Sequence, residues 1–280
     1  MTPTLVRQPF LAASATPARA CARARDWAEI QERMLVPLHE AVYERLEVGP
    51  ATRLLGLDCG SGLALVLAAA RGARVTGLDG RPEQLALARE RLLPPGLWGG
   101  GRDGGALLVE GGPEALAGRS ARPYDVVYAL EPVGCAAGDD EDLAAALGPV
   151  VGLAGHGGAV VLAGWGPPER CATSAVLRVA SRLSEAPRWR PSGRDDLEDV
   201  AARAGLRPDG SGRVACPFGY ADLESAVRGL LSTGLFDAAA RATDQVQVEK
   251  ELTEALHPYL REDGTVWMAN VFRYLIARTP

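Results

Sequence analysis

The sequence has little lysine, histidine or aromatic content. Lys250 is the single lysine among 30 basic residues, three residues are histidine, and 5% of the 280 residues are aromatic. No apolar run reaches the roughly 18 residues that a membrane-spanning helix needs. The net charge of −5, with the basic residues dispersed, argues against a nucleic-acid partner. Its richness in Arg, Ala, Gly and Pro is typical of a GC-rich bacterial genome.

The sequence also lacks paired cysteines. Its five cysteines are scattered, odd in number and contain no C-x-x-C spacing. This pattern predicts free thiols in a reducing compartment, and hence a cytoplasmic protein without disulfides or a zinc site. The cysteines are Cys21, Cys59, Cys135, Cys171 and Cys216.

The length and the apolar content of 47% suit one large domain. Pro9, Ser14 and Pro17 interrupt the apolar start of the chain, which favours a flexible tail over residues 1–22 rather than a signal peptide. Apolar residues then recur at helical spacing from Trp27 to Leu46. We therefore expect a single domain over 23–280, with a helical lid at 23–48 and a core at 49–280.

Strands and helices alternate through the core, which predicts a parallel sheet covered on both faces. A long helix over Ala238–Leu260, a turn and a final strand over Thr265–Ala277 predict an antiparallel end to this sheet. A shorter strand is expected at Arg213–Pro217. The five earlier strands are expected at Arg53–Leu57, Arg74–Leu78, Ala106–Val109, Asp125–Ala129 and Ala159–Ala163, with helices at Leu63–Arg71, Pro82–Leu92, Glu141–Val151 and Glu169–Leu183.

A glycine turn follows the first expected strand and is the most informative motif. In Asp58-Cys59-Gly60-Ser61-Gly62 the glycines would let the backbone approach a ligand. Leu65 stands where a dinucleotide-binding fingerprint has its third glycine. The acid before the glycines would repel a pyrophosphate and suits a cationic ligand. Asp79, about 20 residues on, ends the second strand, where an acid accepts hydrogen bonds from ribose hydroxyls.

Together these motifs resemble the class I S-adenosylmethionine (SAM) methyltransferases, and in particular a bacterial small-molecule (UbiE-like, type 11) subgroup. The resemblance covers roughly residues 25–278. It implies a Rossmann-like, seven-stranded, mostly parallel sheet with helices on both faces, an antiparallel last strand and an N-terminal helical lid. The stretches that carry it are Asp58–Gly62, Val75–Arg89, Leu107–Leu116, Tyr124–Pro132, Asp26–Glu32, Gly158–Cys171 and Cys216–Tyr220.

The resemblance implies SAM as cofactor, with S-adenosylhomocysteine as product. Asp58, Cys59, Gly60, Ser61 and Gly62 would hold the methionyl end. Asp79 and Gly80 would lie at the ribose, Gly112 and Pro113 at the adenine, and Leu130 and Glu131 under the methyl group. Gly112 stands where many members of the family carry an adenine-binding Asp, so that side-chain contact is missing.

The expected acceptor is a small molecule, such as a secondary metabolite, in a pocket lined by Trp27, Gln31, Met34 and Trp165. Glu131 could anchor the methionyl ammonium, accept a proton from the substrate or lie solvated at the rim. His39 is a second candidate base, because its pKa would lie near the working pH. No metal is expected, since Asp139–Asp142 reads as a helix cap, with a Mg²⁺ site as the alternative.

Two other classes stay open. The departures at Gly112, Gly80 and Ala64 are compatible with a methyltransferase-fold protein that has another activity, such as a cyclase, or a non-catalytic partner role. An NAD-dependent oxidoreductase is disfavoured by Asp58 and the missing third glycine. We expect a monomer or homodimer, without a nucleic-acid or membrane partner.

Overall fold

The computed structural model describes residues 16–92, 106–116, 122–129, 131–132, 138–183 and 190–280. Its main sheet has seven strands in the order β3-β2-β1-β4-β5-β9-β6, and a small sheet pairs β7 with β8. Strands β1 to β5 pair in parallel, and β9 runs antiparallel to β5 and β6. The strands are β1 Arg53–Leu57, β2 Arg74–Asp79, β3 Ala106–Glu110, β4 Tyr124–Ala129, β5 Ala154–Trp165, β6 Arg207–Ala215, β7 Phe218–Tyr220, β8 Val266–Met268 and β9 Val271–Arg278.

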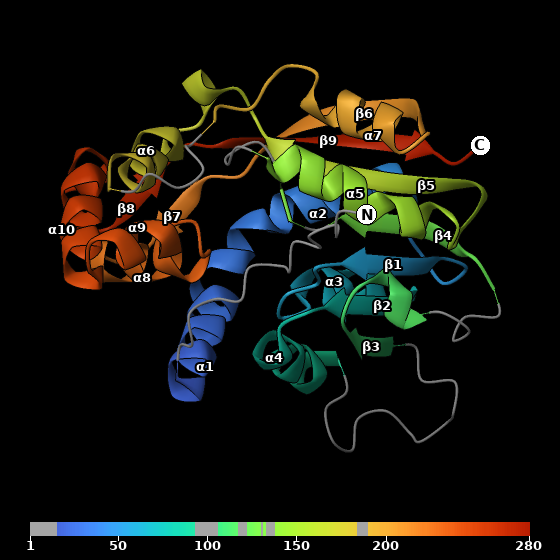
Figure 1. Cartoon of the computed structure of the whole chain (residues 1–280), viewed down its shortest axis with the longest axis horizontal. Helices are drawn as coiled ribbons and strands as arrows, with labels where there is room; N and C mark the ends of the chain where they lie inside the picture. The colour runs from blue at the N-terminus through green and yellow to red at the C-terminus, as the bar shows by residue number, and fades with distance from the viewer. Residues whose placement is uncertain (1–15, 93–105, 117–121, 130, 133–137, 184–189) are drawn as a thin grey trace, which may run out of the picture.

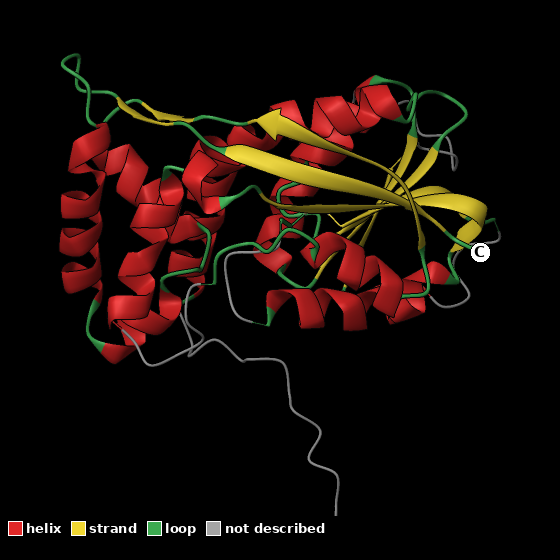
Figure 2. Cartoon of the chain, turned by 90° about the horizontal axis from the view of Figure 1, so that it is seen from above, coloured by secondary structure: helices red, strands yellow, loops and turns green. Residues whose placement is uncertain are grey.

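Helices cover both faces of the main sheet (Figures 1 and 2). Successive side chains of a strand point to opposite faces, so Leu54 enters the core beneath α2 and α3, and Leu55 the core beneath α5 and α7. The predicted fold class is confirmed. The helices are α1 Pro17–Asp26, α2 Val36–Arg45, α3 Leu63–Ala70, α4 Pro82–Leu92, α5 Asp139–Val151, α6 Thr173–Leu183, α7 Asp196–Arg203, α8 Leu223–Ser232, α9 Asp237–Ala242 and α10 Gln245–Leu256.

A second group of helices lies beyond one end of the main sheet. Helices α6, α8, α9 and α10 gather there with the β7–β8 sheet, on the left of Figure 1. Helix α1 and the π-helical turn η1 (Trp27–Gln31) pack between α4 of the core and α8 of this group. The predicted lid segment therefore bridges the sheet layer and the C-terminal helices.

The C-terminal elements are shorter than predicted. The expected helix over Ala238–Leu260 is broken into α9 and α10, because Asp244 caps a new helix by accepting a hydrogen bond from the Gln247 amide at 2.7 Å. The expected strand over Thr265–Ala277 is likewise two strands. The buried Asn270 separates them, and its Oδ1 accepts from the Thr173 amide at 3.1 Å.

The sixth strand, β6, starts earlier than predicted. Proline and glycine are typical of loops, so Pro208, Gly210 and Gly212 did not indicate a strand in the sequence. β6 is an edge strand, which tolerates proline. A Cβ on Gly212 would lie 2.5 Å from the Tyr274 ring, so glycine makes room for a cross-strand aromatic. Residues 1–15 of the expected tail lie outside the described residues, and α1 begins at Pro17.

Candidate functional site

The glycine turn, Asp58–Gly62, follows β1 directly, and three of its residues have a left-handed backbone conformation. The φ angles are +49° at Asp58, +55° at Gly60 and +83° at Gly62. A Cβ on Gly62 would lie 3.0 Å from that of Ala88 in α4, so this glycine serves helix packing. The turn is fixed to β2 because the Cys59 amide donates to the Leu78 carbonyl at 2.8 Å. The Cys59 thiol is inert, since burial raises its pKa to about 12.

Asp79 lies at the end of β2 with its side chain 1% exposed, and it accepts hydrogen bonds from Gly60 and Arg81. Its Oδ2 accepts from the Gly60 amide at 2.8 Å and from the Arg81 guanidinium at 3.0 Å. Its Oδ1 accepts from the Arg81 amide and Nε, at 2.8 and 3.0 Å. A carboxylate has about four acceptor positions, so Asp79 joins the second strand to the glycine turn with none to spare.

Two further carboxylates lie close to this pair. Asp58 and Glu131 are both exposed, yet partial desolvation by the surrounding protein raises the pKa of each. The negative charge of Asp79 raises both further, and Arg81 opposes the effect. Three acids and one arginine thus gather at the carboxyl edge of β1, β2 and β4, where open α/β sheets bind ligands.

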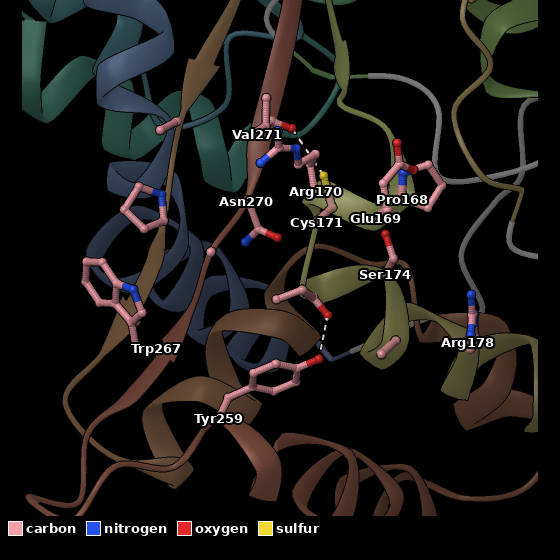
Figure 3. A pocket seen from close by; sticks show the side chains of 15 residues that line it. Pro168, Glu169, Arg170, Cys171, Ser174, Arg178, Tyr259, Trp267, Asn270 and Val271 are labelled. Carbon is pink, nitrogen blue, oxygen red and sulfur yellow. Dashed lines mark hydrogen bonds between the residues drawn. The ribbon is translucent and has the colours of Figure 1, made fainter.

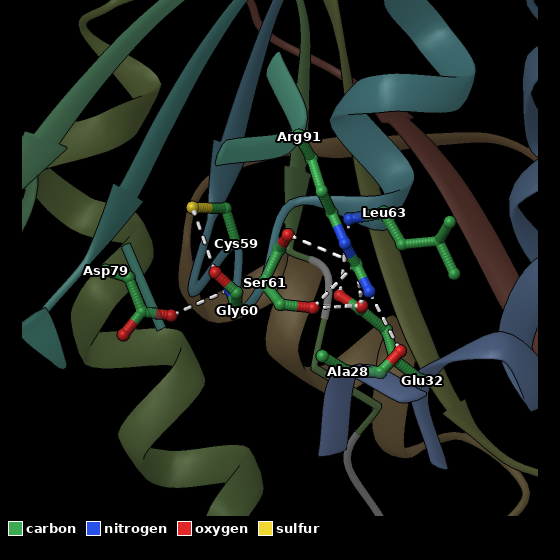
Figure 4. A network of polar contacts seen from close by, with 8 residues as sticks. All are labelled: Ala28, Glu32, Cys59, Gly60, Ser61, Leu63, Asp79 and Arg91. Atoms are coloured by element: carbon green, nitrogen blue, oxygen red, sulfur yellow. Dashed lines mark hydrogen bonds and ion pairs between the residues drawn. The ribbon is translucent and has the colours of Figure 1, made fainter. Parts of the chain in front are cut away.

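A buried polar network fastens the lid to the glycine turn (Figure 4). Glu32 accepts from the Ser61 hydroxyl, from the Leu63 amide at 3.3 Å and from Arg91 at 2.8 Å. Arg91 also donates to the Ala28 carbonyl at 2.9 Å and to Ser61. Burial raises the pKa of Glu32, and the hydrogen bonds from Ser61 and Arg91 counteract that rise.

Trp27 lies over the glycine turn from the lid side. A Cβ on Gly60 would lie 3.1 Å from the indole Nε1, so glycine is needed there for the tryptophan to approach. The indole N–H is buried and has no acceptor among the described residues. A buried donor without a partner costs roughly 1–3 kcal/mol. It would regain a partner if an anionic group, such as a ligand carboxylate, lay beside the turn.

The other proposed acceptor-binding residues have partners elsewhere. Gln31 is buried and accepts from the Tyr220 hydroxyl at 2.9 Å, which ties the lid to β7. Met34 lies in the main core. Trp165 packs against Phe218 and Phe272, with ring centroids 5.8 and 4.5 Å away. The structure therefore brings Trp27 to the acidic site and directs these three side chains to other contacts.

His39 is 2% exposed and lies in a buried aromatic cluster. Its Nδ1 is 3.1 Å from the Tyr128 hydroxyl, and its ring stacks near Tyr43. Burial lowers its pKa to about 4, so the imidazole is neutral at pH 7. The geometry suits a hydrogen-bonded core histidine.

The expected adenine side of the pocket follows β3. Glu114, in the short helix Pro113–Leu116, accepts from the Gly112 amide at 3.2 Å. Gly80 faces open space, since nothing lies within 4 Å of a Cβ placed there. Leu130 lies outside the described residues. Among those described, no cluster of His, Cys, Asp or Glu has metal-binding geometry.

The acidic run lies in the first turn of α5, where its negative charges suit the helix dipole as predicted, but none of these side chains makes a capping hydrogen bond. Gly138 is the N-cap, and no side chain caps this helix. Asp140 pairs with Arg203 at 3.0 Å and with Arg190 at 3.4 Å instead. These arginines come from far along the chain, so local spacing could not have revealed the pairing.

Four residues of the site region were missed from the sequence: Arg81, Glu32, Arg91 and Tyr220. Arg81 carried one usable signal, a cation two residues after a strand-ending acid. Glu32 carried another, as an acid within the apolar lid stripe. Nothing in the sequence pairs Arg91 with a residue 59 positions away.

Two cavities lie away from this cluster. One of about 670 Å³ opens between the Pro168–Arg170 turn, α6 and the β7–β8 sheet, and Figure 3 shows Asn270, Tyr259 and Trp267 around it. The other, of about 600 Å³, shares the wall at Pro168–Arg170. Of the predicted site residues, none lines either cavity.

Comparisons with known proteins identify the fold. No protein-family model and no curated protein matches this chain. Among solved structures, a candidate methyltransferase of Bacillus halodurans has a TM-score of 0.53 at 14% identity, covering 86% of this chain and 98% of the other. YjhP of Escherichia coli has a TM-score of 0.52 at 20% identity, covering 93% and 100%. The [4+2]-cyclase SpnF has a TM-score of 0.50 at 15% identity, covering 87% and 80%.

The chain therefore has the Rossmann-like fold of the class I SAM-dependent methyltransferases, and the resemblance inferred from the sequence is confirmed at the level of the fold. No helix among the described residues is long and apolar enough to cross a membrane.

Proposed function

We propose that this chain is a SAM-dependent methyltransferase that acts on an O, N or C atom of a small molecule, of the secondary-metabolite kind. The observation that carries the proposal is the group of Asp58, Glu131 and Trp27 around the glycine turn. Two exposed carboxylates would attract the ammonium and sulfonium charges of SAM. The unpartnered indole N–H would donate to its carboxylate.

Methyl transfer to a nucleophile needs mainly proximity and alignment. Bound SAM would supply the electrophilic methyl group. Glu131 follows β4 at the carboxyl edge, so it could hold the ammonium or accept a proton from the acceptor. Its raised pKa suits the second role, because a stronger base accepts a proton more readily at neutral pH.

Calorimetry with SAM and S-adenosylhomocysteine tests the proposal. We expect binding in the micromolar range, weakened about tenfold or more in Asp58→Asn, because a charge-assisted contact contributes about 1.5–3 kcal/mol. Asn is the suitable replacement since it tolerates left-handed backbone. The absence of any heat at millimolar SAM would remove the proposal, and unchanged affinity in Asp58→Asn would remove Asp58 from the site.

A second candidate is a non-methylating activity, such as a cyclase, on the same fold. The observation that favours it is the occupied carboxylate of Asp79, together with a [4+2]-cyclase among the structural neighbours. SAM binding without methyl transfer to any member of a panel of phenols, amines and enolisable carbonyls would favour this candidate. Transfer of a labelled methyl group to one of them would exclude it.

A further inference from the structure

A groove at the carboxyl end of β5 gathers arginines from four separate segments. It has a volume of about 600 Å³ and lies where β5 ends, β6 ends and β9 begins. Arg170 comes from the turn after β5, Arg194 from the segment before α7, Arg213 from β6 and Arg273 from β9. Glu169 is the one acid in its lining, so the groove is locally basic in a chain of net charge −5.

Most of this charge is not paired with a carboxylate among the residues that the structure describes. Arg273 is 13% exposed and pairs with Glu198 at 2.8 Å. For Arg170, Arg194 and Arg213, no carboxylate partner exists among the described residues. All three of these side chains are exposed. Three guanidinium groups are thus available to a ligand in the groove.

The arrangement carries an electrostatic cost. Arg213 and Arg273 are directly opposite each other on β6 and β9. Like charges directly opposite each other destabilise a sheet. The pairing of Arg273 with Glu198 offsets part of the repulsion, and an anion between the two arginines would offset the rest.

The wall that carries Arg194 is held in place by backbone contacts. Arg273 donates to the Arg194 carbonyl, and the Ser192 hydroxyl donates to the Gly166 carbonyl at 2.6 Å. The Gly193 amide donates to Asp196 at 2.6 Å. The backbone that presents Arg194 is therefore fixed, which lowers part of the entropy cost of binding.

We propose that this groove binds the phosphate or diphosphate group of a small molecule. Guanidinium forks match phosphate oxygens in pairs, and several of them suit a multiply charged anion better than a single carboxylate. The volume is within the range of small-molecule sites. The groove shares no residue with the acidic site, so the proposal does not depend on methyl transfer.

Calorimetry on the full chain with inorganic pyrophosphate, in the absence of SAM, tests this site. We expect binding that Arg213→Ala and Arg194→Ala each weaken about tenfold. Arg207→Ala is the matched control, because Arg207 is exposed at the other end of the same strand, and it should leave the affinity unchanged. Thermal unfolding of each variant, without ligand, checks that the fold is retained.

Three results would overturn the proposal: no binding of pyrophosphate at millimolar concentration, equal loss in Arg207→Ala and Arg213→Ala, or unchanged affinity in both groove variants. An equal loss in Arg207→Ala and Arg213→Ala would show that pyrophosphate binds through the general positive charge of the surface and not in the groove. An alkyl diphosphate that binds more tightly than pyrophosphate, with the same sensitivity to Arg213→Ala, would support a phosphorylated small molecule over the free anion as the ligand.

Discussion

Asp79 and Arg81, two residues apart at the end of β2, form a two-pronged ion pair in which each carboxylate oxygen accepts from the guanidinium at 3.0 Å. The same carboxylate is the one expected to bind the ribose hydroxyls of SAM. Asp79 cannot accept from the Arg81 guanidinium and from the ribose hydroxyls at the same time. The Gly60 and Arg81 amides already occupy the other acceptor positions of its carboxylate. If Asp79 binds the ribose as proposed, Arg81 would compete with the cofactor for this carboxylate.

Removing this competitor should favour SAM. We expect Arg81→Ser to raise the SAM affinity about tenfold, because the released carboxylate oxygens would accept from the ribose. Arg89→Ser, at an exposed position of α4, is the control for general charge effects and should change little. Calorimetry measures both. A loss of affinity confined to Arg81→Ser would instead make Arg81 part of the cofactor site.

The left-handed backbone at Asp58 predicts a trade between stability and binding. A non-glycine residue in this conformation costs about 1 kcal/mol, and glycine avoids the cost. The greater unfolded-state entropy of glycine offsets part of this gain, so Asp58→Gly should raise the free energy of unfolding by no more than about 0.5 kcal/mol in urea titrations while weakening SAM binding. If Asp58→Gly unfolds more easily than the wild type, the carboxylate stabilises the fold by some other contact.

The raised pKa values of Asp58 and Glu131 predict a distinctive pH dependence. Cofactor affinity should fall as the pH drops through these raised values, since both carboxylates become neutral. The stability of the free protein should move the opposite way. The folded state binds more protons between the unfolded and folded pKa values, so these groups' contribution to stability is present at low pH and lost as the pH rises.

Glu131→Gln separates these two trends. Glu131→Gln should weaken the pH dependence of SAM affinity and of the unfolding midpoint, each measured between pH 4 and 8. Identical curves for Glu131→Gln and the wild type would show that Glu131 titrates at an ordinary value.

Arg91 should matter more for stability than its partial exposure suggests. Arg91→Ala leaves the buried Glu32 with the Ser61 and Leu63 contacts only. We expect a loss of about 2 kcal/mol in unfolding free energy, less than for a fully buried pair because solvent screens Arg91. The double variant Glu32→Gln/Arg91→Ala should recover part of this lost unfolding free energy, because it leaves no buried unpaired charge. If Arg91→Ala and the double variant lose the same unfolding free energy, the buried charge of Glu32 is not the cause of the loss.

The neutral His39 predicts an uneventful pH profile near neutrality. With a pKa of about 4, it cannot supply a titration between pH 6 and 8. His39→Asn should therefore leave the shape of any activity profile in that range unchanged, even if the aromatic cluster weakens. A profile whose limb near pH 6.5 disappears in His39→Asn would restore it as a base.

The sequence predicted the fold well because its strands are short apolar runs that end in turn residues. Leu54 to Leu57 and the glycines after them leave little choice of structure. The ends of elements in the C-terminal part were less predictable. There the breaks depend on single polar side chains, such as Asp244 and Asn270, whose role rests on the partner that each finds in the folded chain.

The candidate site was predictable in position but not in its pairing. Asp58, Asp79 and Glu131 lie at or just after the ends of three parallel strands whose order in the sheet brings them together. That Asp79 is held by Arg81, and that Gln31 is held by Tyr220, depends on side-chain directions after the strands have formed. Spacing along the chain does not contain those directions.

The Gln31–Tyr220 hydrogen bond joins residues 189 positions apart, and two arginine ion pairs of the same lid, Arg228–Asp26 and Arg23–Asp237, span 202 and 214. On the ribosome, the first helix can therefore contact α4 early, but its second docking surface, on α8, is missing until more than three quarters of the chain has been made. Closing so long a loop is entropically costly. The docking of the lid onto the C-terminal helices should therefore follow the formation of the sheet. A nascent or truncated chain that ends before α8 could form most of the sheet and still lack a closed pocket.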